Sequence, residues 1–489
     1  MEKIFQDFTT RIADTHCYKF FRLIDSQVSR NLKSAEIETR KSKSNGLWCF
    51  ALLPMVLVMY TVQCHVSPLY KLVTCASIGL LFYSLLFSVF LSISFLILQE
   101  QLYGGCISTS LVSVLLMYIF VLQDFTFCTI FSVPTVLIYS WLLRSSLSCF
   151  PNTFTIGEAM VMTQGVVLFG VMAVAKITCS LVETDEEIDF IYTIIYTVLS
   201  TVGLIVTALF LLKDEQRNLI SLAYILGFGT AYTLLMFISQ LGVSCFFVIF
   251  DYIFIENNRY QIISFWLVLL LLSVTVLTMR TQLAVKASTV TRKSFHILAS
   301  AVFLSGILLD VNLMLLASGI GFGLLILVEA LRKSNIEPIS SALHSAFLVY
   351  SDEKDSGTFA MTPIYLYVGL ACPLALSPQL KGRELELLSG VLSIGVGDTA
   401  ASWFGSKYGF NKWSSGNRTY EGTAFNILSQ IATVYALLLF ELLDTKYALL
   451  RTAFAATITG LVEAKTNQVD NLVLPLVMLI AFRLTSFLQ

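Results

Sequence analysis

The amino-acid sequence predicts an all-α polytopic integral membrane protein with roughly 14–15 transmembrane helices. Two observations carry this prediction. Hydrophobic residues make up 56% of the 489 positions and charged residues only 13%, and the mean hydropathy is +0.79. These values lie outside the range of soluble globular proteins. The net charge is −1 and no basic face is visible, so we expect the lipid bilayer as a partner and no nucleic acid.

Residues 1–47 are polar and are predicted to form a cytosolic N-terminal tail. The segment contains nine Lys and Arg residues, including a cluster at 40–43 directly before the first apolar run. Positive residues that flank a first span usually stay on the cytosolic side. The apolar side chains of Phe20, Phe21 and Leu23 fit an amphipathic surface helix. A loose tail fits the pattern equally well.

Residues 48–280 are predicted to be membrane scaffold helices. Apolar runs follow one another here with short polar breaks, and each run is long enough to cross about 30 Å of hydrocarbon as a helix. Residues 281–489 differ, because polar residues occur at the ends of almost every apolar run or inside it. Ionisable groups at membrane depth are tolerated mainly where they line a site. This second half is therefore the predicted catalytic membrane domain.

The segment GVGDTAASWFGSKYGFNKWSSGNRTYEGT, from Gly395 to Thr423, begins in an apolar run and ends in a polar loop. Read as a helix, its first half places a small residue at every fourth position, at Gly397, Ala401, Gly405 and Gly409. Small residues on one face allow a neighbouring helix backbone to approach closely. Asp398 stands among them, where an uncompensated carboxylate would be costly.

The loop that follows carries Lys407, Lys412 and Arg418 together with glycines. Cations and exposed backbone N–H groups suit a polyphosphate, so this is the predicted cytosolic nucleotide-binding loop. Asp398 and Glu421 could hold the accompanying magnesium ion. A packing helix followed by an ordinary basic loop remains the alternative. The glycine spacing also matches the dinucleotide fingerprint, but that motif requires a preceding strand, and none is expected here.

Two further groups of polar residues occur in the second half. Arg292 and Lys293 precede His296 by four and three residues, so on a helix all three share a face and could meet a phosphate. A positive-inside anchor is the alternative reading. Near the end of the chain, Glu463 and Asp470 fall on one face if their segment is helical. Carboxylates at a membrane boundary are costly unless they coordinate a ligand or pair with a cation.

The motifs RKSFH, DEKDSG, GVGDTAASWFGSKYG, NRTYEGT and EAKTNQVDNLVLPL occur in this order between about residues 285 and 485. The set resembles the dolichol kinases, the eukaryotic members of a wider group of membrane polyprenol and phytol kinases related to the CDP-diacylglycerol synthases. Where relatives usually show Lys before the Thr of a T-x-E-G pattern, this chain has Arg418. The first half matches the family only in hydropathy.

The resemblance implies that the γ-phosphoryl group of CTP is transferred to the terminal hydroxyl of dolichol, giving dolichyl phosphate and CDP. The reaction would take place on the cytosolic side of the endoplasmic reticulum membrane and would supply the lipid carrier for protein glycosylation. Mg²⁺ or another divalent cation is the expected cofactor, because phosphoryl transfer depends on positioning and charge neutralisation.

The expected roles fall on a small set of positions. The candidate metal ligands are Asp398, Glu421, Glu463 and Asp470. The candidate catalytic residues are Asp398, Glu421 and His296, with Asp398 favoured as the base that accepts the alcohol proton. The candidate nucleotide-binding residues are Lys407, Lys412, Arg418, Thr419, Gly422, Thr423, Arg292 and Lys293. If Arg418 only supplies charge to a phosphate, the substitution Arg418→Lys should be mild.

Two alternative functions remain open at this point. A cytidylyltransferase that forms a CDP-lipid would use similar residues but release pyrophosphate instead of CDP. A polytopic transporter would carry ions on its intramembrane acids and consume no nucleotide. No inverted repeat of the transporter type is visible in the sequence.

The sequence also predicts the side of the membrane that the loop faces. Asn417-Arg418-Thr419 is the only N-x-S/T sequon in the chain, and a lumenal sequon is open to N-glycosylation. Because the loop is predicted to be cytosolic, Asn417 should stay unmodified, and endoglycosidase treatment after expression in microsomes should cause no mobility shift. A Ser415→Cys variant should react with a membrane-impermeant reagent added from the cytosolic side. A glycan on Asn417 would contradict the assignment.

Overall fold

The computed structural model describes residues 16–179, 185–255, 259–282, 289–350, 357–413 and 418–488. These residues are almost entirely helical and contain no β-strand; Lys412 and Thr419 form an isolated antiparallel bridge. The all-α prediction is confirmed. The glycines of the dinucleotide-like pattern lie in a π-helix, so the strand that a dinucleotide site requires is absent from this described part of the chain.

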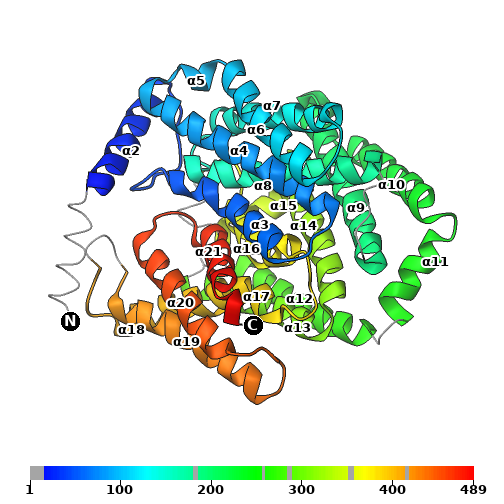
Figure 1. The fold of residues 1–489 in the computed structure, drawn as a ribbon. Coiled ribbons are helices and arrows are strands. Elements are labelled where there is room, and N and C mark those ends of the chain that lie inside the picture. Colours follow the sequence, from blue (N-terminus) through cyan, green and yellow to red (C-terminus); the bar gives the residue numbers. More distant parts are fainter. Residues whose placement is uncertain are drawn as a thin grey trace. The chain divides into compact units, whose positions relative to one another are not determined.

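The chain divides into two compact units. The first comprises residues up to Leu181 together with Ser356–Thr358. Its helices are α2 (His16–Ser34), η1 (Leu47–Ala51), α3 (Leu52–Gln63), α4 (Pro68–Ile93), α5 (Leu96–Gln99), α6 (Tyr103–Phe120), α7 (Phe125–Cys149) and α8 (Ile156–Cys179). Figure 1 labels α2 to α8 along the blue and cyan part of the ribbon.

The second unit comprises Val182–Asp355 and Phe359–Gln489. Its first elements are α9 (Glu186–Leu211), η2 (Asp214–Gln216), α10 (Leu219–Leu241), α11 (Cys245–Phe250), η3 (Asp251–Ile255), α12 (Arg259–Gln282), α13 (Thr289–Leu309), α14 (Val311–Lys333), α15 (Ile339–Tyr350) and α16 (Met361–Leu376). The remaining elements are α17 (Glu384–Leu387), η6 (Val391–Asp398), α18 (Thr399–Tyr408), α19 (Tyr420–Leu439), α20 (Ala448–Lys465), α21 (Asp470–Leu484) and η7 (Ser486–Leu488).

Nine helices in the described part of the chain are long and apolar enough to cross a membrane. They are Pro68–Ile93, Tyr103–Phe120, Phe125–Cys149, Ile156–Thr178, Glu186–Leu211, Leu219–Leu241, Arg259–Met279, Val311–Lys333 and Tyr420–Leu439. Other apolar helices, such as Met361–Leu376, are shorter. Within the described ranges, helix length and composition thus identify nine candidate spans, and the number of roughly 14–15 for the chain stays a prediction.

The first unit is built around α4, which packs against α6, α7 and α8. Two reciprocal hydroxyl pairs, Tyr83 with Ser140 and Ser84 with Tyr139, lie inside it at 2.6 Å each. Arg40 is buried and pairs with the buried Glu158. One cation of the predicted positive-inside cluster therefore forms an ion pair inside the protein. The segment 16–34 is helical, which favours the surface-helix interpretation over a loose tail.

In the second unit, α9 packs against α14 and α10, while α19, α20 and α21 pack in sequence. Helices α9 to α12 therefore share a compact unit with the predicted catalytic region. Along the chain, the division between the two compact units falls after residue 181, not near residue 280. The functional division into scaffold residues 48–280 and catalytic residues 281–489 remains a prediction.

A buried ionic cluster joins α17, α20 and α21. Glu386 accepts hydrogen bonds from Arg451 Nη2 at 3.1 Å and from Arg483 Nη1 at 3.1 Å. All three side chains are essentially inaccessible to solvent. Arg451 lies in the first turn of α20 and Arg483 in the last turn of α21, so the cluster ties together one end of this helical hairpin.

We predict that Glu386→Ala strongly destabilises the protein, because two buried guanidinium groups would lose their carboxylate. Removing one partner of a buried pair costs about 3–5 kcal/mol. The thermal midpoint of the purified protein, followed by size-exclusion chromatography after heating, measures the effect. Asp214→Ala is the control, because Asp214 is 95% exposed in its pair with Arg217, and such pairs contribute about 1 kcal/mol or less. Equal midpoints would contradict the assignment.

Candidate active site

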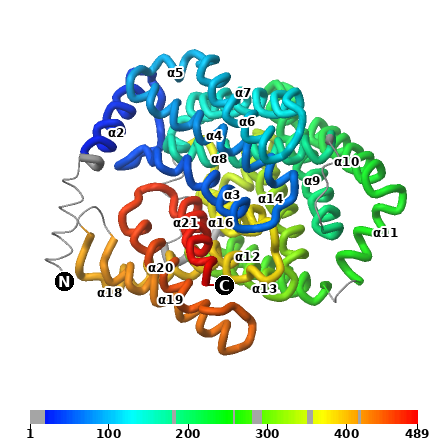
Figure 2. Tube along the Cα trace, in the orientation of Figure 1, coloured from blue at the N-terminus to red at the C-terminus, as the bar shows by residue number. Residues whose placement is uncertain are grey.

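Six elements of the second unit converge around the predicted catalytic segment. Helix α18 packs against α19, η6 packs against α13 and α19, and α20 joins α19 to α21. Figure 2 traces α18 to α21 as consecutive orange-to-red segments. Two polar connections, 409–419 and 466–469, link these helices. The site is therefore assembled from residues distant in sequence.

The ridge of small residues lies along α19, as the four-residue spacing predicts. A Cβ atom on Gly405 would lie 3.3 Å from the Cα of Gly422, and one on Gly409 would lie 2.6 Å from the Thr419 side chain. A Cβ atom on Gly397 would lie 2.5 Å from Gln430 Nε2. Glycine at these positions allows η6 and α18 to approach α19 closely.

Asp398 ends the π-helix η6 and pairs with Lys293 from α13. The two side chains are 8% and 17% exposed. Short π-helical segments occur frequently at functional sites because they shift the register of the side chains that follow. The structure thus joins two predicted site residues that are 105 positions apart in the chain.

Arg418 is the centre of the acidic part of the site. Its Nη2 atom donates to both carboxylate oxygens of Asp470 at 2.9 Å, and its Nη1 atom donates to the Thr466 carbonyl at 2.7 Å. Its Nε atom lies 3.7 Å from Glu463 Oε1. Asp398 is within electrostatic reach of both Arg418 and Glu463. Two of the four predicted metal ligands, Asp470 and Glu463, therefore contact one guanidinium, and Asp398 is within its electrostatic reach.

The electrostatics of Arg418 follow from this placement. Burial alone would lower the pKa of its guanidinium, but the carboxylates of Asp470 and Glu463 outweigh that effect and raise the pKa above its ordinary value. The group stays charged, and it compensates acids that have lost most of their water. The planar guanidinium lets Nη2 reach Asp470 while Nη1 reaches the Thr466 carbonyl, which a single ammonium group cannot do in the same way.

A chain of amides extends from Glu463 into α19. Asn426 Nδ2 donates to Glu463 Oε2 at 2.8 Å, and Gln430 Nε2 donates to Asn426 Oδ1 at 2.5 Å. Both amides are buried, and Gln430 Oε1 has no hydrogen-bond partner among the described residues. Neither residue belongs to the motifs that predict the site from the sequence. Two amides one helical turn apart in an apolar span are the signal that could have identified them.

The ends of the polar loop are held by backbone and side-chain contacts. Trp413 N donates to the Arg418 carbonyl at 2.9 Å, and Trp413 Nε1 donates to the Thr423 hydroxyl at 3.1 Å. Thr419 caps α19 by accepting from Gly422 N at 3.1 Å. Thr419, Gly422 and Thr423 thus shape the loop, and their contact with a nucleotide stays a prediction. The loop tip, residues 414–417 with the Asn417 sequon, lies outside the described residues.

The remaining predicted site residues are Glu421, Lys407, Lys412, His296 and Arg292. Glu421 accepts hydrogen bonds from Asn411 N and Nδ2 at 3.2 and 2.9 Å, so it anchors the loop end. Lys407 and Lys412 are exposed. His296 is buried in α13. The side chain of Arg292 lies outside the described residues.

The side chains at the site have the chemistry that a magnesium ion requires, because Asp398, Glu463 and Asp470 provide the hard oxygen atoms that Mg²⁺ prefers. The unsatisfied Gln430 Oε1 adds a buried oxygen to this region. Among the residues that the structure describes, no three acidic, His or Cys side chains already converge on one point. The carboxylates face Lys293 and Arg418 instead.

Sequence comparisons complete the description of the site. The sequence model of the dolichol kinase family matches residues 29–413. A bovine dolichol kinase is 31% identical over 369 residues, covering 71% of this chain and 68% of that protein. The human dolichol kinase is 30% identical over 367 residues, with the same coverage. The Arabidopsis thaliana dolichol kinase EVAN is 29% identical over 379 residues, covering 69% of this chain and 65% of that protein.

This chain belongs to the dolichol kinase family. The family match begins at residue 29, so it includes much of the first half, where the sequence motifs alone indicate only similar hydropathy. No solved structure matches the chain. The family membership and the helical architecture together establish a multi-pass membrane protein of the dolichol kinase type.

The geometry around Arg418 changes the expectation for Arg418→Lys. A lysine would keep the charge but lose the bidentate contact with Asp470 or the bond to Thr466. A charged hydrogen bond contributes roughly 1.5–3 kcal/mol, so kinase activity should fall about 10- to 100-fold. Arg217→Lys, at an arginine that donates to the Ser334 carbonyl at 3.1 Å, is the matched control. Equal, small effects of both substitutions in a turnover assay would contradict the role of Arg418.

Proposed function

We propose that this protein is a CTP-dependent kinase that phosphorylates dolichol in the endoplasmic reticulum membrane, with its active site facing the cytosol. The observation that carries the proposal is the gathering of Asp398, Glu463 and Asp470 around Arg418 and Lys293 in a chain of the dolichol kinase family. The product, dolichyl phosphate, would serve protein glycosylation as the lipid carrier.

The cations Lys293 and Arg418 explain how the site could bind a triphosphate. Lys293 and Arg418 each pair with a carboxylate. An incoming triphosphate offers stronger anionic partners, so Lys293 would move from Asp398 to the phosphates. Arg418 lies at the loop end beside Lys412 and Thr419 and would neutralise the same group. The exposed Lys407 and Lys412 fit the phosphates or the pyrimidine side of the nucleotide.

The acids explain the chemical step. The hydroxyl oxygen of dolichol forms a bond to the γ-phosphorus while the bond from that phosphorus to the β–γ bridging oxygen breaks, and CDP leaves with this oxygen. The hydroxyl proton passes to Asp398, which becomes more basic once Lys293 has turned to the phosphates. Glu463 and Asp470, the candidate metal ligands that do not take the proton, would hold a Mg²⁺ ion, which would supply charge neutralisation for the transferring phosphoryl group.

The side-chain amides of Asn426 and Gln430 position Glu463 as a metal ligand. Asn426 fixes one carboxylate oxygen and Gln430 fixes Asn426, so the carboxylate cannot rotate freely. Gln430 is ten residues after Tyr420, about 15 Å into α19 at 1.5 Å per residue. A polar chain therefore leads from membrane depth to the acids, in the direction from which a lipid alcohol approaches.

The proposal is tested by following the products. The purified full-length protein, given dolichol and CTP labelled on the γ-phosphate, should release CDP and transfer the label to the lipid, and ATP should replace CTP poorly. Asp398→Asn should lower turnover by about 100-fold or more if Asp398 is the base, whereas Asp444→Asn in an exposed loop should not. Release of pyrophosphate with a CDP-lipid would indicate a cytidylyltransferase. Ion flux without nucleotide consumption would indicate a transporter.

A further inference from the structure

Helix α2 carries one apolar stripe in two different environments. Apolar side chains recur every four residues along it, at Phe20, Ile24, Val28 and Leu32, which places them on one face. In the second half of the helix, Val28 and Leu32 are 0% and 3% exposed, because this half packs on α4. In the first half, Phe20 and Phe21 are 62% and 68% exposed. The apolar stripe is thus covered by α4 in the second half of α2 and is exposed in the first half.

Two sets of hydrogen bonds hold α2 at the ends of membrane helices. Asn31 Nδ2 donates to the Leu91 carbonyl, in the last turn of α4, at 2.7 Å. Asn45 donates to Asp25 Oδ1 from its backbone N at 2.9 Å and from Nδ2 at 3.0 Å. Asn45 lies two residues before η1, which leads into the first apolar helix. Because α4 is about 39 Å long at 1.5 Å per residue, its ends reach the surfaces of a hydrocarbon core about 30 Å thick.

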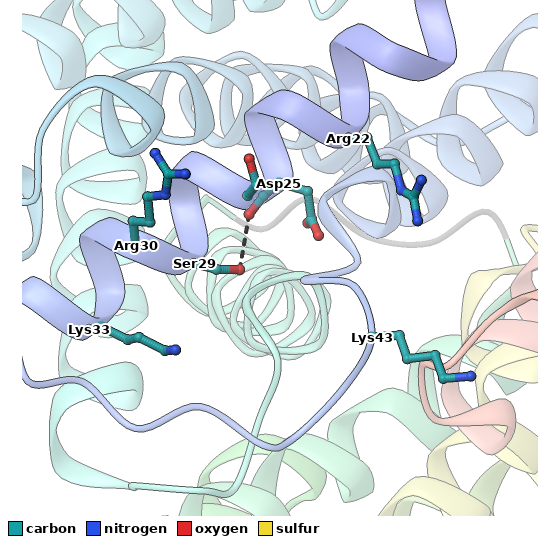
Figure 3. Close-up of a pocket in the computed structure, with 7 residues that line it drawn as sticks. Arg22, Asp25, Ser29, Arg30, Lys33 and Lys43 are labelled. Carbon is teal, nitrogen blue, oxygen red and sulfur yellow. Dashed lines mark hydrogen bonds between the residues drawn. The ribbon is translucent and has the colours of Figure 1, made fainter. Parts of the chain in front are cut away.

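The opposite face of α2 is basic and hollowed. An open cavity of about 390 Å³ lies against it, and its lining residues are Arg22, Asp25, Ser26, Ser29, Arg30, Lys33 and Lys43. Figure 3 shows that the cations come from two segments, α2 and the chain that follows it. Arg22, Arg30, Lys33 and Lys43 are exposed. The lining is positive because these four cations face a single carboxylate, Asp25.

The two faces fit one orientation at a bilayer. A helix is about 10–12 Å across, and the headgroup layer is roughly 5–7 Å thick on each side of the hydrocarbon core. If the Phe20 and Phe21 rings enter the acyl chains, the basic face lies at the level of the lipid phosphates. Amphipathic helices with aromatic residues on one face and Lys or Arg on the other bind membrane surfaces in this way.

We propose that α2 is an interfacial helix whose exposed half inserts Phe20 and Phe21 into the bilayer surface, while the cavity lined by Arg22, Arg30, Lys33 and Lys43 binds the phosphate group of an anionic lipid. The cytosolic orientation proposed for residues 1–47 places this site at the leaflet that is rich in anionic lipids. The inference uses only contacts of the first compact unit and does not rest on the kinase activity.

The insertion is tested by crosslinking. The full-length protein carrying the photoreactive residue p-benzoylphenylalanine in place of Phe21 is reconstituted in phosphatidylcholine nanodiscs with or without phosphatidylserine. After irradiation, intact mass spectrometry should detect lipid attached at this position. The same photoreactive residue in place of Ser26, on the basic face, is the matched control and should give little lipid adduct. An adduct yield at position 21 no higher than at position 26 would overturn the insertion.

The phosphate site is tested by charge reversal. The double variant Arg30→Glu/Lys33→Glu should lower the retention of phosphatidylserine, measured by native mass spectrometry, by roughly 30-fold, since each of the two lost cations contributes about 1 kcal/mol near a surface. Lys213→Glu/Lys446→Glu, at two exposed lysines outside the cavity, should retain the lipid. Equal retention in both double variants would overturn the site.

The source of the phosphate is tested in the same nanodiscs. Hydrogen exchange of the backbone of α2 should slow when phosphatidylserine is present and should not slow when inorganic phosphate is added to phosphatidylcholine discs. Protection by inorganic phosphate alone would mean that the cavity takes a soluble anion and would overturn the lipid assignment. This measurement uses the unsubstituted protein, so it does not depend on whether the charge-reversal variants fold.

Discussion

The compensation of buried carboxylates by Arg418 and Lys293 is the constraint on which the site depends. Glu463, Asp470 and Asp398 have lost most of their water, and an isolated carboxylate in such surroundings is very costly. Each therefore needs a cation or a hydrogen-bond donor nearby. Arg418 reaches Asp470 and the Thr466 carbonyl with one planar group, which ties the loop before α19 to the connection between α20 and α21. Lys293 ties α13 to the end of η6.

The same hairpin is held by ionic contacts at its other end. Glu386 joins Arg451 and Arg483 there, and apolar side chains of α21 such as Met478 and Phe482 are buried along its length. Helices α20 and α21 are thus fixed at both ends, which limits how far Glu463 and Asp470 can move apart. A site that must hold a phosphoryl group benefits from acids positioned before the substrate arrives.

The candidate site was predicted in part from the sequence. The sequence singles out Asp398, Arg418, Glu463 and Asp470, because charged residues at a membrane boundary are costly unless they have partners. In the structure these four residues lie in one group. Glu421 belongs to the same motif but binds Asn411, because its position on α19 turns it toward the loop. Asn426 and Gln430 were not identified, since single amides in an apolar run are weak signals until their partners across helices are known.

The sequence by itself determined the class of the protein. Hydrophobic composition and apolar run length require helices in a bilayer, where every backbone polar group must be satisfied within its own segment. The four-residue spacing of Gly397, Ala401, Gly405 and Gly409 determined that a helix would pack closely on that face. Only the tertiary structure decided which cation meets which acid, because the Lys293–Asp398 and Arg418–Asp470 pairs join residues 105 and 52 positions apart. Pairings of that range depend on how helices pack around each other, and no local pattern of residues encodes them.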